Sequence, residues 1–249
     1  MNNTIILFIA ICVCILYFIH NHRNEQLAPI SKQCSKCWVN KNEFPEAEYI
    51  FANKHIIKKE LLNVITSDKW SKWDASTAYD DKTPIFTKMT HGEINDRLDN
   101  SHGKINPNEK SWKLYGLMLN KQILKTAVNC PNTMQIINKF PDRILNVGFS
   151  LLEPHAETKP HKDFNNKFYR LHIPMIIPKN NAKYKKNNNT SIVNKKHIKN
   201  NLAIFQVEND HKIWTDDEYF IFDDTCMHNA WNNTNENRIV LLVDLLKNN

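Results

Sequence analysis

The stretch FIFDDTCMHNAWNNTNENRIVLLVDLL, from Phe220 to Leu246, combines strand-like apolar patterns with a few polar residues near the end of the chain. Apolar residues alternate with other residues in its first part, and an apolar run follows near its end. Both patterns are typical of β-strands that are buried on at least one face. Between the two apolar parts the chain places His228 and, ten residues further on, Arg238. The stretch therefore predicts two strands that carry one imidazole and one guanidinium in otherwise apolar surroundings.

The period-two pattern begins at Val147 and dominates to the C-terminus, whereas residues 47–146 are mixed. In the mixed part, SWKLYGLMLNKQILKTAV (111–128) and NTMQIINKF (132–140) have apolar spacings that predict helices. Helices followed by strands predict an α+β domain with a mainly β core, a sandwich or barrel, and helices packed on one side. Residues 179–201 are rich in Lys and Asn and lack an apolar period, which predicts a surface loop inserted between strands.

The composition is that of an ordinary globular protein. The 249 residues are 41% hydrophobic and 24% charged, which suffices for one sizeable domain or two small ones. The formal net charge is +7. Asn, Lys and Ile are abundant, which indicates a drift toward AT-rich codons, so the net charge is weak evidence for an anionic partner. No ordered stripe of Arg with interleaved aromatic residues is present, so we expect no nucleic-acid partner.

The N-terminus predicts a membrane anchor. Residues 4–19, TIILFIAICVCILYFI, carry no charge and are slightly short of the roughly 20 residues that span a bilayer. They are nevertheless long for the core of a signal peptide, and no small-x-small cleavage motif follows. We expect a single-pass anchor over 1–22, a linker over 23–46 and a folded domain over 47–249, with a cleaved signal peptide as the alternative. Basic residues after the anchor favour a cytosolic body, but this bias alone leaves the side of the membrane open.

The six cysteines do not form the pattern of a secreted disulfide framework. Four of them stand alone or within the apolar segment, at Cys12, Cys14, Cys130 and Cys226. Cys34 and Cys37 form a lone CxxC, and a structural zinc site would need a second pair of ligands. We therefore expect a local disulfide between Cys34 and Cys37, or two free thiols, rather than a metal site.

A second polar cluster lies between Ser150 and Pro178, in SLLEPHAETKPHKDFNNKFYRLHIPMIIP. Side chains two residues apart on a strand share a face, so we expect His161 and Asp163 to point to the same place. Such a pair supplies one imidazole and one carboxylate, and a distant His completes two-His-one-carboxylate coordination. His161, Asp163 and His228 are therefore the candidate ligands of an iron(II) ion with three open positions.

Iron with three open positions can bind a bidentate co-substrate together with dioxygen. 2-Oxoglutarate chelates through its C1 carboxylate and C2 ketone, and its far carboxylate then needs a buried cation. Arg is suited to that task because it is charged at neutral pH and makes two parallel hydrogen bonds to a carboxylate. We expect Arg238, on the strand beside His228, to bind the far carboxylate of 2-oxoglutarate. Zinc is the rival metal, but an open site with a carboxylate-binding Arg favours iron.

Several motifs resemble the aspartyl/asparaginyl β-hydroxylase family of iron- and 2-oxoglutarate-dependent dioxygenases, over about residues 112–246. They are WKLYGL, CPNT, FSLLEP, KPHKDF, YRLHIPMIIP, WTDDE and FDDTCMHNAWNNTNENRIVLLVD. The resemblance implies a double-stranded β-helix (jelly-roll, cupin-like) core with flanking helices, so that 47–249 would be a dioxygenase domain. It implies iron ligands at His161 and His228, with Asp163 available to complete a triad that some members lack.

The resemblance also implies contacts to 2-oxoglutarate from four residues, Ser150, Arg170, His172 and Arg238. The long Lys/Asn segment and the lack of a helical-repeat domain before the core depart from the family pattern. We expect hydroxylation of an unactivated C–H bond, in the first place at the β-carbon of Asp or Asn in a protein. The N-terminal anchor keeps a lipid acyl chain open as the substrate. A catalytically silent jelly-roll binding protein would predict a missing triad residue, and none is missing.

Overall fold

The computed structural model describes residues 37–67, 69–72, 112–158, 160–163, 166–194, 197–198 and 200–247. The anchor predicted at the N-terminus lies outside these residues. Within the described ranges, no helix combines the length and the apolar character that crossing a bilayer requires.

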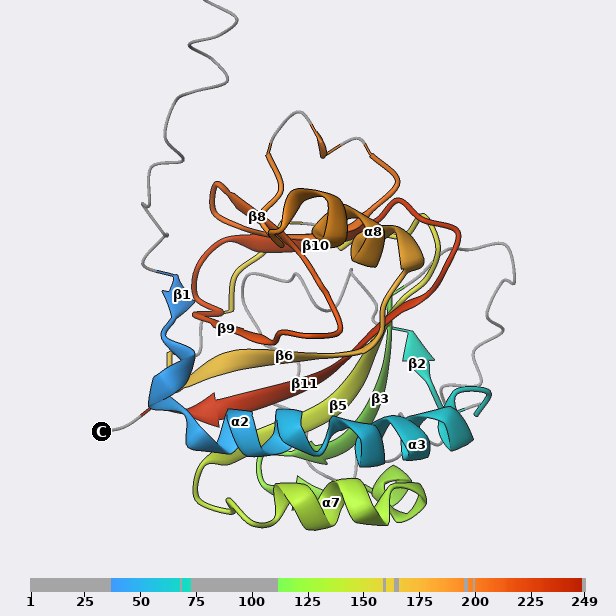
Figure 1. Ribbon diagram of the computed structural model, residues 1–249. Coiled ribbons are helices and arrows are strands. Elements are labelled where there is room, and N and C mark those ends of the chain that lie inside the picture. Colours follow the sequence, from blue (N-terminus) through green and yellow to red (C-terminus); the bar gives the residue numbers. More distant parts are fainter. Residues whose placement is uncertain are drawn as a thin grey trace, which may run out of the picture. The chain divides into compact units, whose positions relative to one another are not determined.

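The described residues form two antiparallel sheets (Figure 1). The strands are β1 Trp38–Val39, β2 Ser71–Lys72, β3 Trp112–Leu119, β4 Gln122–Ile123, β5 Ile144–Leu152, β6 Phe168–Ile176, β7 Ala203–Val207, β8 Asp210–Ile213, β9 Phe220–Phe222, β10 His228–Asn232 and β11 Arg238–Leu246. The large sheet has the order β1-β9-β6-β11-β5-β3-β2, with β4 paired to β3, and the small sheet has the order β10-β7-β8. Two facing sheets joined by crossing connections confirm the predicted mainly β, jelly-roll core.

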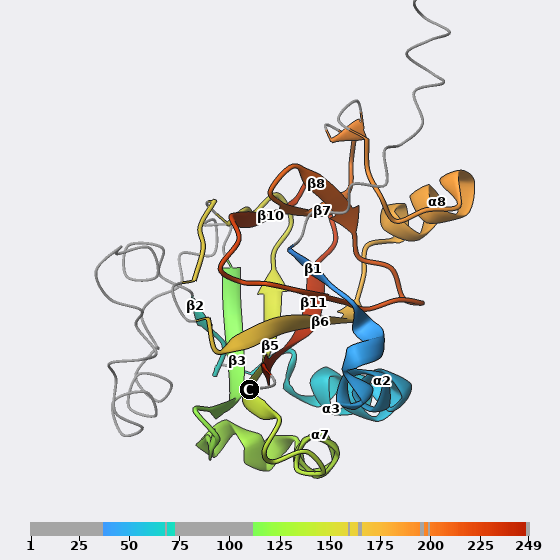
Figure 2. The same ribbon diagram turned by 90° about the vertical axis from the view of Figure 1, so that its left-hand side faces the viewer.

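The helices and 3-10 turns are η1 Lys41–Glu43, α2 Pro45–Ala52, α3 Lys54–Val64, η2 Lys125–Asn129, α7 Pro131–Ile137 and α8 Lys179–Asn188. Both α2 and α7 begin with a proline, whose fixed φ suits the first helical turn. Figures 1 and 2 show α2, α3 and α7 on one side of the large sheet, with the small sheet on its other side. The predicted packing of helices on one side is thus confirmed for these three helices.

Alternation along the strands divides the buried residues into two cores. On β11, Ile239, Leu241 and Val243 point toward the helices, where they pack with Ile57 and Leu61 of α3. The intervening residues of the same strand, among them Arg238, Val240 and Asp244, point to the other face, toward the small sheet. The inter-sheet core also contains Leu152, Phe222, Phe205 and Ala230. Polar residues of the large sheet whose side chains point to the same face as Val240 therefore lie between the two sheets.

The helix predicted over residues 111–128 is wrong. Trp112–Leu119 form β3, which pairs with β5 in the large sheet, and only Lys125–Asn129 are helical, as the 3-10 turn η2. Tyr115 and Leu117 of β3 are fully buried. A strand with both faces largely covered carries a near-continuous apolar run, and such a run cannot be told from a helix by periodicity. The second predicted helix, over 132–140, is confirmed in part by α7.

The surface loop predicted over residues 179–201 is wrong in its first half, which forms α8. Asn181 and Tyr184, three residues apart on this helix, are buried against the small sheet. The Asn181 amide donates to the Ala203 and Trp214 carbonyls, and its Oδ1 accepts from the Ala203 amide nitrogen. Two inward-facing residues thus hold an otherwise polar helix, which is too few for an apolar period to be visible in the sequence.

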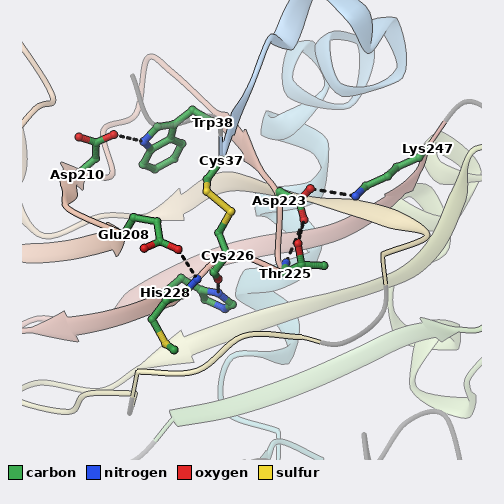
Figure 3. The surroundings of a disulfide bond; sticks show 10 residues. Cys37, Trp38, Glu208, Asp210, Asp223, Thr225, Cys226, His228 and Lys247 are labelled. Atoms are coloured by element: carbon green, nitrogen blue, oxygen red, sulfur yellow. Dashed lines mark hydrogen bonds and ion pairs between the residues drawn. A yellow bond between two sulfur atoms is a disulfide. The ribbon is translucent and has the colours of Figure 1, made fainter. Parts of the chain in front are cut away.

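The segment predicted as a linker, 23–46, belongs to the folded unit from Cys37 onward. Trp38 and Val39 form β1, which pairs with the short strand β9 at the edge of the large sheet. Neither alternative expected for Cys37, a local disulfide with Cys34 or a free thiol, is correct, because Cys37 is bonded to Cys226, 189 residues away (Figure 3). Only the pairing of β1 with β9 brings these cysteines together, so their sequence spacing gives no sign of the bond.

Candidate active site

Two of the three predicted metal ligands lie side by side between the sheets. His228 begins β10, and the extended segment at His161 runs antiparallel to it, with mutual backbone hydrogen bonds of 3.0 and 2.8 Å. The two imidazole centroids are 4.3 Å apart, and His228 is buried. This juxtaposition of residues 67 positions apart creates a site where two nitrogen ligands could bind one ion.

Asp163, the predicted third ligand, follows the same segment, and its amide nitrogen donates to the Asp224 carbonyl at 2.8 Å. A carboxylate oxygen of Asp163 and one ring nitrogen each of His161 and His228, all three of which are described residues, do not come within 4.8 Å of one another as a set. The H-x-D segment is a single bridge and not a regular strand. The strict alternation from which a shared face was expected therefore does not apply to it.

Asp224, which sequence reasoning did not single out, is fully buried beside the imidazole pair. Its Oδ1 lies 3.1 Å from Nε2 of His228, and its Oδ2 lies 2.7 Å from an Nη of Arg170. Burial raises the pKa of Asp224 to about 7, against the opposing effect of Arg170. Burial, followed by the neighbouring His161, holds the pKa of His228 well below its usual range. His228 is therefore neutral, which is the form that binds metals.

The tautomer of His228 follows from its backbone contact. Its Nδ1 lies 2.9 Å from the Cys226 carbonyl oxygen, which can only accept a hydrogen bond. Nδ1 therefore carries the proton, and Nε2 is the nitrogen left with a lone pair on the side of Asp224. A hydrogen bond to the non-ligating nitrogen is the usual way in which proteins orient a metal-binding histidine.

Arg170 of β6 lies at one end of the inner face, between two carboxylates. Its Nε is 2.8 Å from Oδ1 of Asp244, directly opposite on β11, and an Nη atom reaches Asp224 at 2.7 Å. Burial acts to lower the pKa of Arg170, but Asp224 and Asp244 together raise it. The contact to 2-oxoglutarate expected for Arg170 competes with these two ion pairs, which already occupy its guanidinium.

His172, two residues further along β6, is buried among aromatic rings. Its Nδ1 accepts a hydrogen bond of 3.3 Å from Nε1 of Trp214. Burial, and then the charge of Arg238, holds the pKa of His172 well below its usual range. The rings around it are Phe205, Phe220 and Phe222. His172 is thus a neutral polar group in a water-poor wall of the site.

Arg238, at the start of β11, is the second buried guanidinium of the inner face. One Nη donates to the Ser150 carbonyl at 3.1 Å and lies 3.4 Å from its Oγ, and the group sits 4.5 Å from the centre of the Trp214 ring. Its Nε has no hydrogen-bond partner, and no carboxylate of the described residues pairs with it. Burial alone lowers the pKa of Arg238 to about 9. A buried cation without a counter-ion favours binding of an anion.

The strand relation expected for Arg238 is wrong in one respect. His228 is on β10 of the small sheet, whereas Arg238 is on β11 of the large sheet, so the two approach the site from different sheets and not from neighbouring strands. Trp112 connects the two halves, because its Nε1 donates to Ser150 Oγ at 2.8 Å and its ring lies 6.2 Å from that of His161.

The donor set fits the groups that the sequence predicts. Two adjacent imidazoles, one of them buried and neutral, with carboxylates nearby suit a divalent iron ion. The uncompensated guanidinium of Arg238, with Ser150 beside it, suits one end of a dicarboxylate. Three further residues of the site, Asp224, Trp112 and Trp214, lie within the quoted motifs, but nothing in their sequence spacing assigns them a contact.

Comparison with known proteins places these residues in a family. The sequence model of the family described as aspartyl/asparaginyl beta-hydroxylase matches residues 52–248. An ornithine lipid ester-linked acyl 2-hydroxylase of Rhizobium tropici is 32% identical over 140 residues, which cover 55% of this chain and 42% of that protein. The aspartyl/asparaginyl beta-hydroxylase of Homo sapiens is 25% identical over 119 residues, which cover 46% of this chain and 13% of that protein. The chain thus spans less than half the length of these relatives.

Solved structures give weaker matches. A predicted oxalate decarboxylase from Thermotoga maritima matches with a TM-score of 0.32 and 11% identity, over 56% of this chain and 84% of that one. A cupin domain from Bordetella pertussis matches with a TM-score of 0.27 and 14% identity, over 43% and 84% of the two chains. The assignment of the fold rests on the strand order and register described above, and not on these matches.

Proposed function

Because the chain belongs to the aspartyl/asparaginyl β-hydroxylase family, we propose that it is an Fe(II)- and 2-oxoglutarate-dependent dioxygenase that hydroxylates an unactivated C–H bond. The observation that carries this proposal is the pairing of two features in one inter-sheet space. Adjacent imidazoles of His161 and His228 lie on one side, and the uncompensated guanidinium of Arg238 lies on the other. A dicarboxylate co-substrate needs both features, because one of its ends chelates the metal held by the imidazoles and its other end pairs with the guanidinium.

Each residue then has a distinct task. His161 and His228 hold the iron, which when bound supplies the activation of dioxygen, with 2-oxoglutarate as the source of two electrons. Arg238 and Ser150 bind the far carboxylate and so fix the position of the co-substrate. Burial of the aromatic wall around His172 excludes water from the site, which strengthens these charged contacts. We propose Asp163 as the carboxylate ligand, with a smaller contribution than the two histidines.

For the substrate, we propose an Asp or Asn side chain of a protein, hydroxylated at its β-carbon. The human relative is named for that reaction. A lipid acyl chain is the second candidate, since the ornithine lipid enzyme is more similar in sequence, at 32% identity, and residues 4–19 are apolar. Peptide libraries and extracted lipids, incubated separately with the enzyme, distinguish the two by which sample gains the mass of one oxygen atom.

The proposed reaction class is tested by succinate release. Purified protein supplied with Fe(II), 2-oxoglutarate and air should form succinate, and His228→Ala and His161→Ala should reduce the rate to background while the circular dichroism spectrum is retained. Asp163→Ala should keep partial activity, because water can occupy a carboxylate position. Wild-type turnover in His228→Ala would show that the imidazole pair is not the metal site.

A further inference from the structure

The strand nearest the N-terminus in the described part of the chain is covalently attached to the segment that holds His228. Cys37 immediately precedes β1, and its disulfide partner Cys226 lies two residues before His228 (Figure 3). The backbone reinforces this link, because the Asp223 amide donates to the Cys37 carbonyl at 2.8 Å and the Cys226 amide donates to the Asp223 carbonyl at 3.0 Å. The turn before His228 leads into the small sheet, but the segment at Cys37, which leads into the large sheet, holds it in place.

Cys226 also contacts the imidazole directly. Its carbonyl oxygen accepts the Nδ1 proton of His228 at 2.9 Å, as the dashed line in Figure 3 shows. This contact decides which ring nitrogen is free for a metal and helps to set the direction in which it points. The residue that bears one sulfur of the disulfide is thus the same residue that orients the proposed iron ligand.

Trp38, the next residue after Cys37, packs on the aromatic rings that contact His228. Its ring centroid lies 6.2 Å from Phe205 and 6.4 Å from Phe222, and the His228 ring lies 6.0 and 5.1 Å from the same two rings. Trp38 Nε1 also donates to Asp210 of the small sheet at 3.1 Å, although its own strand pairs with the large sheet. β1 therefore holds both sheets beside the ligand.

We propose that the Cys37–Cys226 disulfide is a positioning device for His228, which keeps the Cys226 carbonyl and the turn around it in the place that aims Nε2 at the metal. The inference rests on the proposed role of His228 as a metal ligand. Groups that orient a metal-binding histidine commonly change metal affinity by about 10- to 100-fold when removed. The affinity of the His161–His228 pair for a divalent ion should therefore depend on the bond.

Reduction of the bond should have the same effect as removing it by mutation. A phosphine reductant supplies two electrons, two protons from water form the thiols of Cys37 and Cys226, and the phosphine takes up the water oxygen as its oxide. The two-residue pairing with β9, the backbone hydrogen bond from Asp223 to Cys37 and the local side-chain contacts of the described residues then hold β1 without the covalent bond. Reoxidation with oxidised glutathione restores the disulfide through two thiol–disulfide exchanges.

The experiment measures Mn²⁺ affinity by titration calorimetry under nitrogen, which needs no turnover. Cys226→Ser, Cys37→Ser and the double variant should each bind Mn²⁺ about 10- to 100-fold more weakly than wild type, and to a similar extent as one another. Cys130→Ala is the matched control, since Cys130 is a buried free thiol at the start of α7. Leu61→Ala, in the core on the helix side, is the control for lost stability without a change near His228.

A second arm serves if the variants fail to fold. Wild-type protein is reduced, freed of reductant, titrated with Mn²⁺, then reoxidised and titrated again, with mass spectrometry to count the thiols at each stage. Affinity that falls and returns with the bond supports the proposal. Affinity within twofold of wild type without the bond overturns it, as do free thiols at Cys37 and Cys226 in the protein as purified. Wild type that binds no Mn²⁺ at all would overturn the proposed function together with this inference.

Discussion

Arg170 and Arg238 lie on the same inner face of the large sheet, yet their surroundings differ in one respect. The guanidinium of Arg170 lies between the carboxylates of Asp224 and Asp244, at 2.7 and 2.8 Å. That of Arg238 contacts the Ser150 carbonyl and an aromatic ring, and no carboxylate of the described residues pairs with it. The carboxylates raise the pKa of Arg170 against its burial, whereas burial alone lowers that of Arg238.

The difference separates a structural cation from a receptor for an anion. A buried charge is destabilising unless it is paired, so a folded chain that keeps a buried charge unpaired is less stable because of it. The unpaired charge then gains most when a ligand supplies the missing partner. By this criterion Arg170 maintains the site from the side of Asp224, and Arg238 is the residue that binds the co-substrate. Substitution of the two should therefore affect different quantities.

The largest effect is expected for Arg170→Ala, on stability. It leaves Asp224 and Asp244 buried without their shared cation, and breaking a buried pair in this way costs about 3–5 kcal/mol. Urea unfolding followed by tryptophan fluorescence measures the loss. The double variant Arg170→Met/Asp244→Leu should recover part of it, since it removes one of the stranded carboxylates as well. An unfolding free energy within about 0.5 kcal/mol of wild type, the usual range for surface substitutions, would mean that Arg170 is not a structural cation.

The next largest effect is expected for Arg238→Ala, on co-substrate binding. Loss of a buried partner of a charged ligand costs about 2–5 kcal/mol, or roughly 30- to several-thousand-fold in affinity. Arg238→Lys keeps the charge but not the forked donor geometry, so its loss of affinity should be smaller. Calorimetry with Mn²⁺-loaded protein and 2-oxoglutarate measures both variants.

The control for Arg238 is a co-substrate without the far carboxylate, such as 2-oxobutanoate, whose affinity should be the same in wild type and in Arg238→Ala. Arg238→Met should leave the free energy of unfolding unchanged or raise it, because it removes an uncompensated buried charge. Equal losses for 2-oxoglutarate and for the shortened compound would place the carboxylate partner elsewhere, with Arg170 as the first alternative.

The smallest effect is a pH dependence of 2-oxoglutarate affinity. Because the pKa of Arg238 is lowered to about 9, its positive charge is complete at pH 7 and is lost as the pH rises through that value. The bound carboxylate favours the charged form, so affinity should fall above pH 9 by up to about tenfold per pH unit, the limit for one linked proton. Affinity for 2-oxobutanoate, measured over the same range, should not show this decline.

The structure brings together His161 and His228, which the sequence singled out as candidate ligands, although one of the elements around them was predicted wrongly. His228 and Arg238 stand out in the sequence because polar residues are conspicuous in apolar strands, and His161 stands out because Asp163 follows it at the H-x-D spacing. The polar residues that complete their surroundings, Asp224 above all, become visible only when β6, β10 and β11 are placed in space. The strand Trp112–Leu119 was mistaken for a helix because both of its faces are largely covered.

Contacts between distant segments could not be predicted from the sequence for a related reason. A disulfide across 189 residues depends on the pairing of β1 with β9, and each of these strands is too short to show a period. Asp163 was expected on the face of His161 by strand alternation, but the segment forms only a single bridge. Sequence patterns report how a segment is buried, and they do so reliably only where the segment is long and regular.

The bond between Cys37 and Cys226 also bears on the compartment in which the folded part of the chain operates. Glutathione and thioredoxin keep thiols reduced in the cytosol, whereas disulfides persist in the endoplasmic reticulum, the periplasm and outside the cell. The basic residues after the apolar segment 4–19 favour a cytosolic body, and the disulfide favours the opposite side. We expect the disulfide to be the better guide, and we propose that the folded part, with its protein or lipid substrate, lies on the side that faces away from the cytosol.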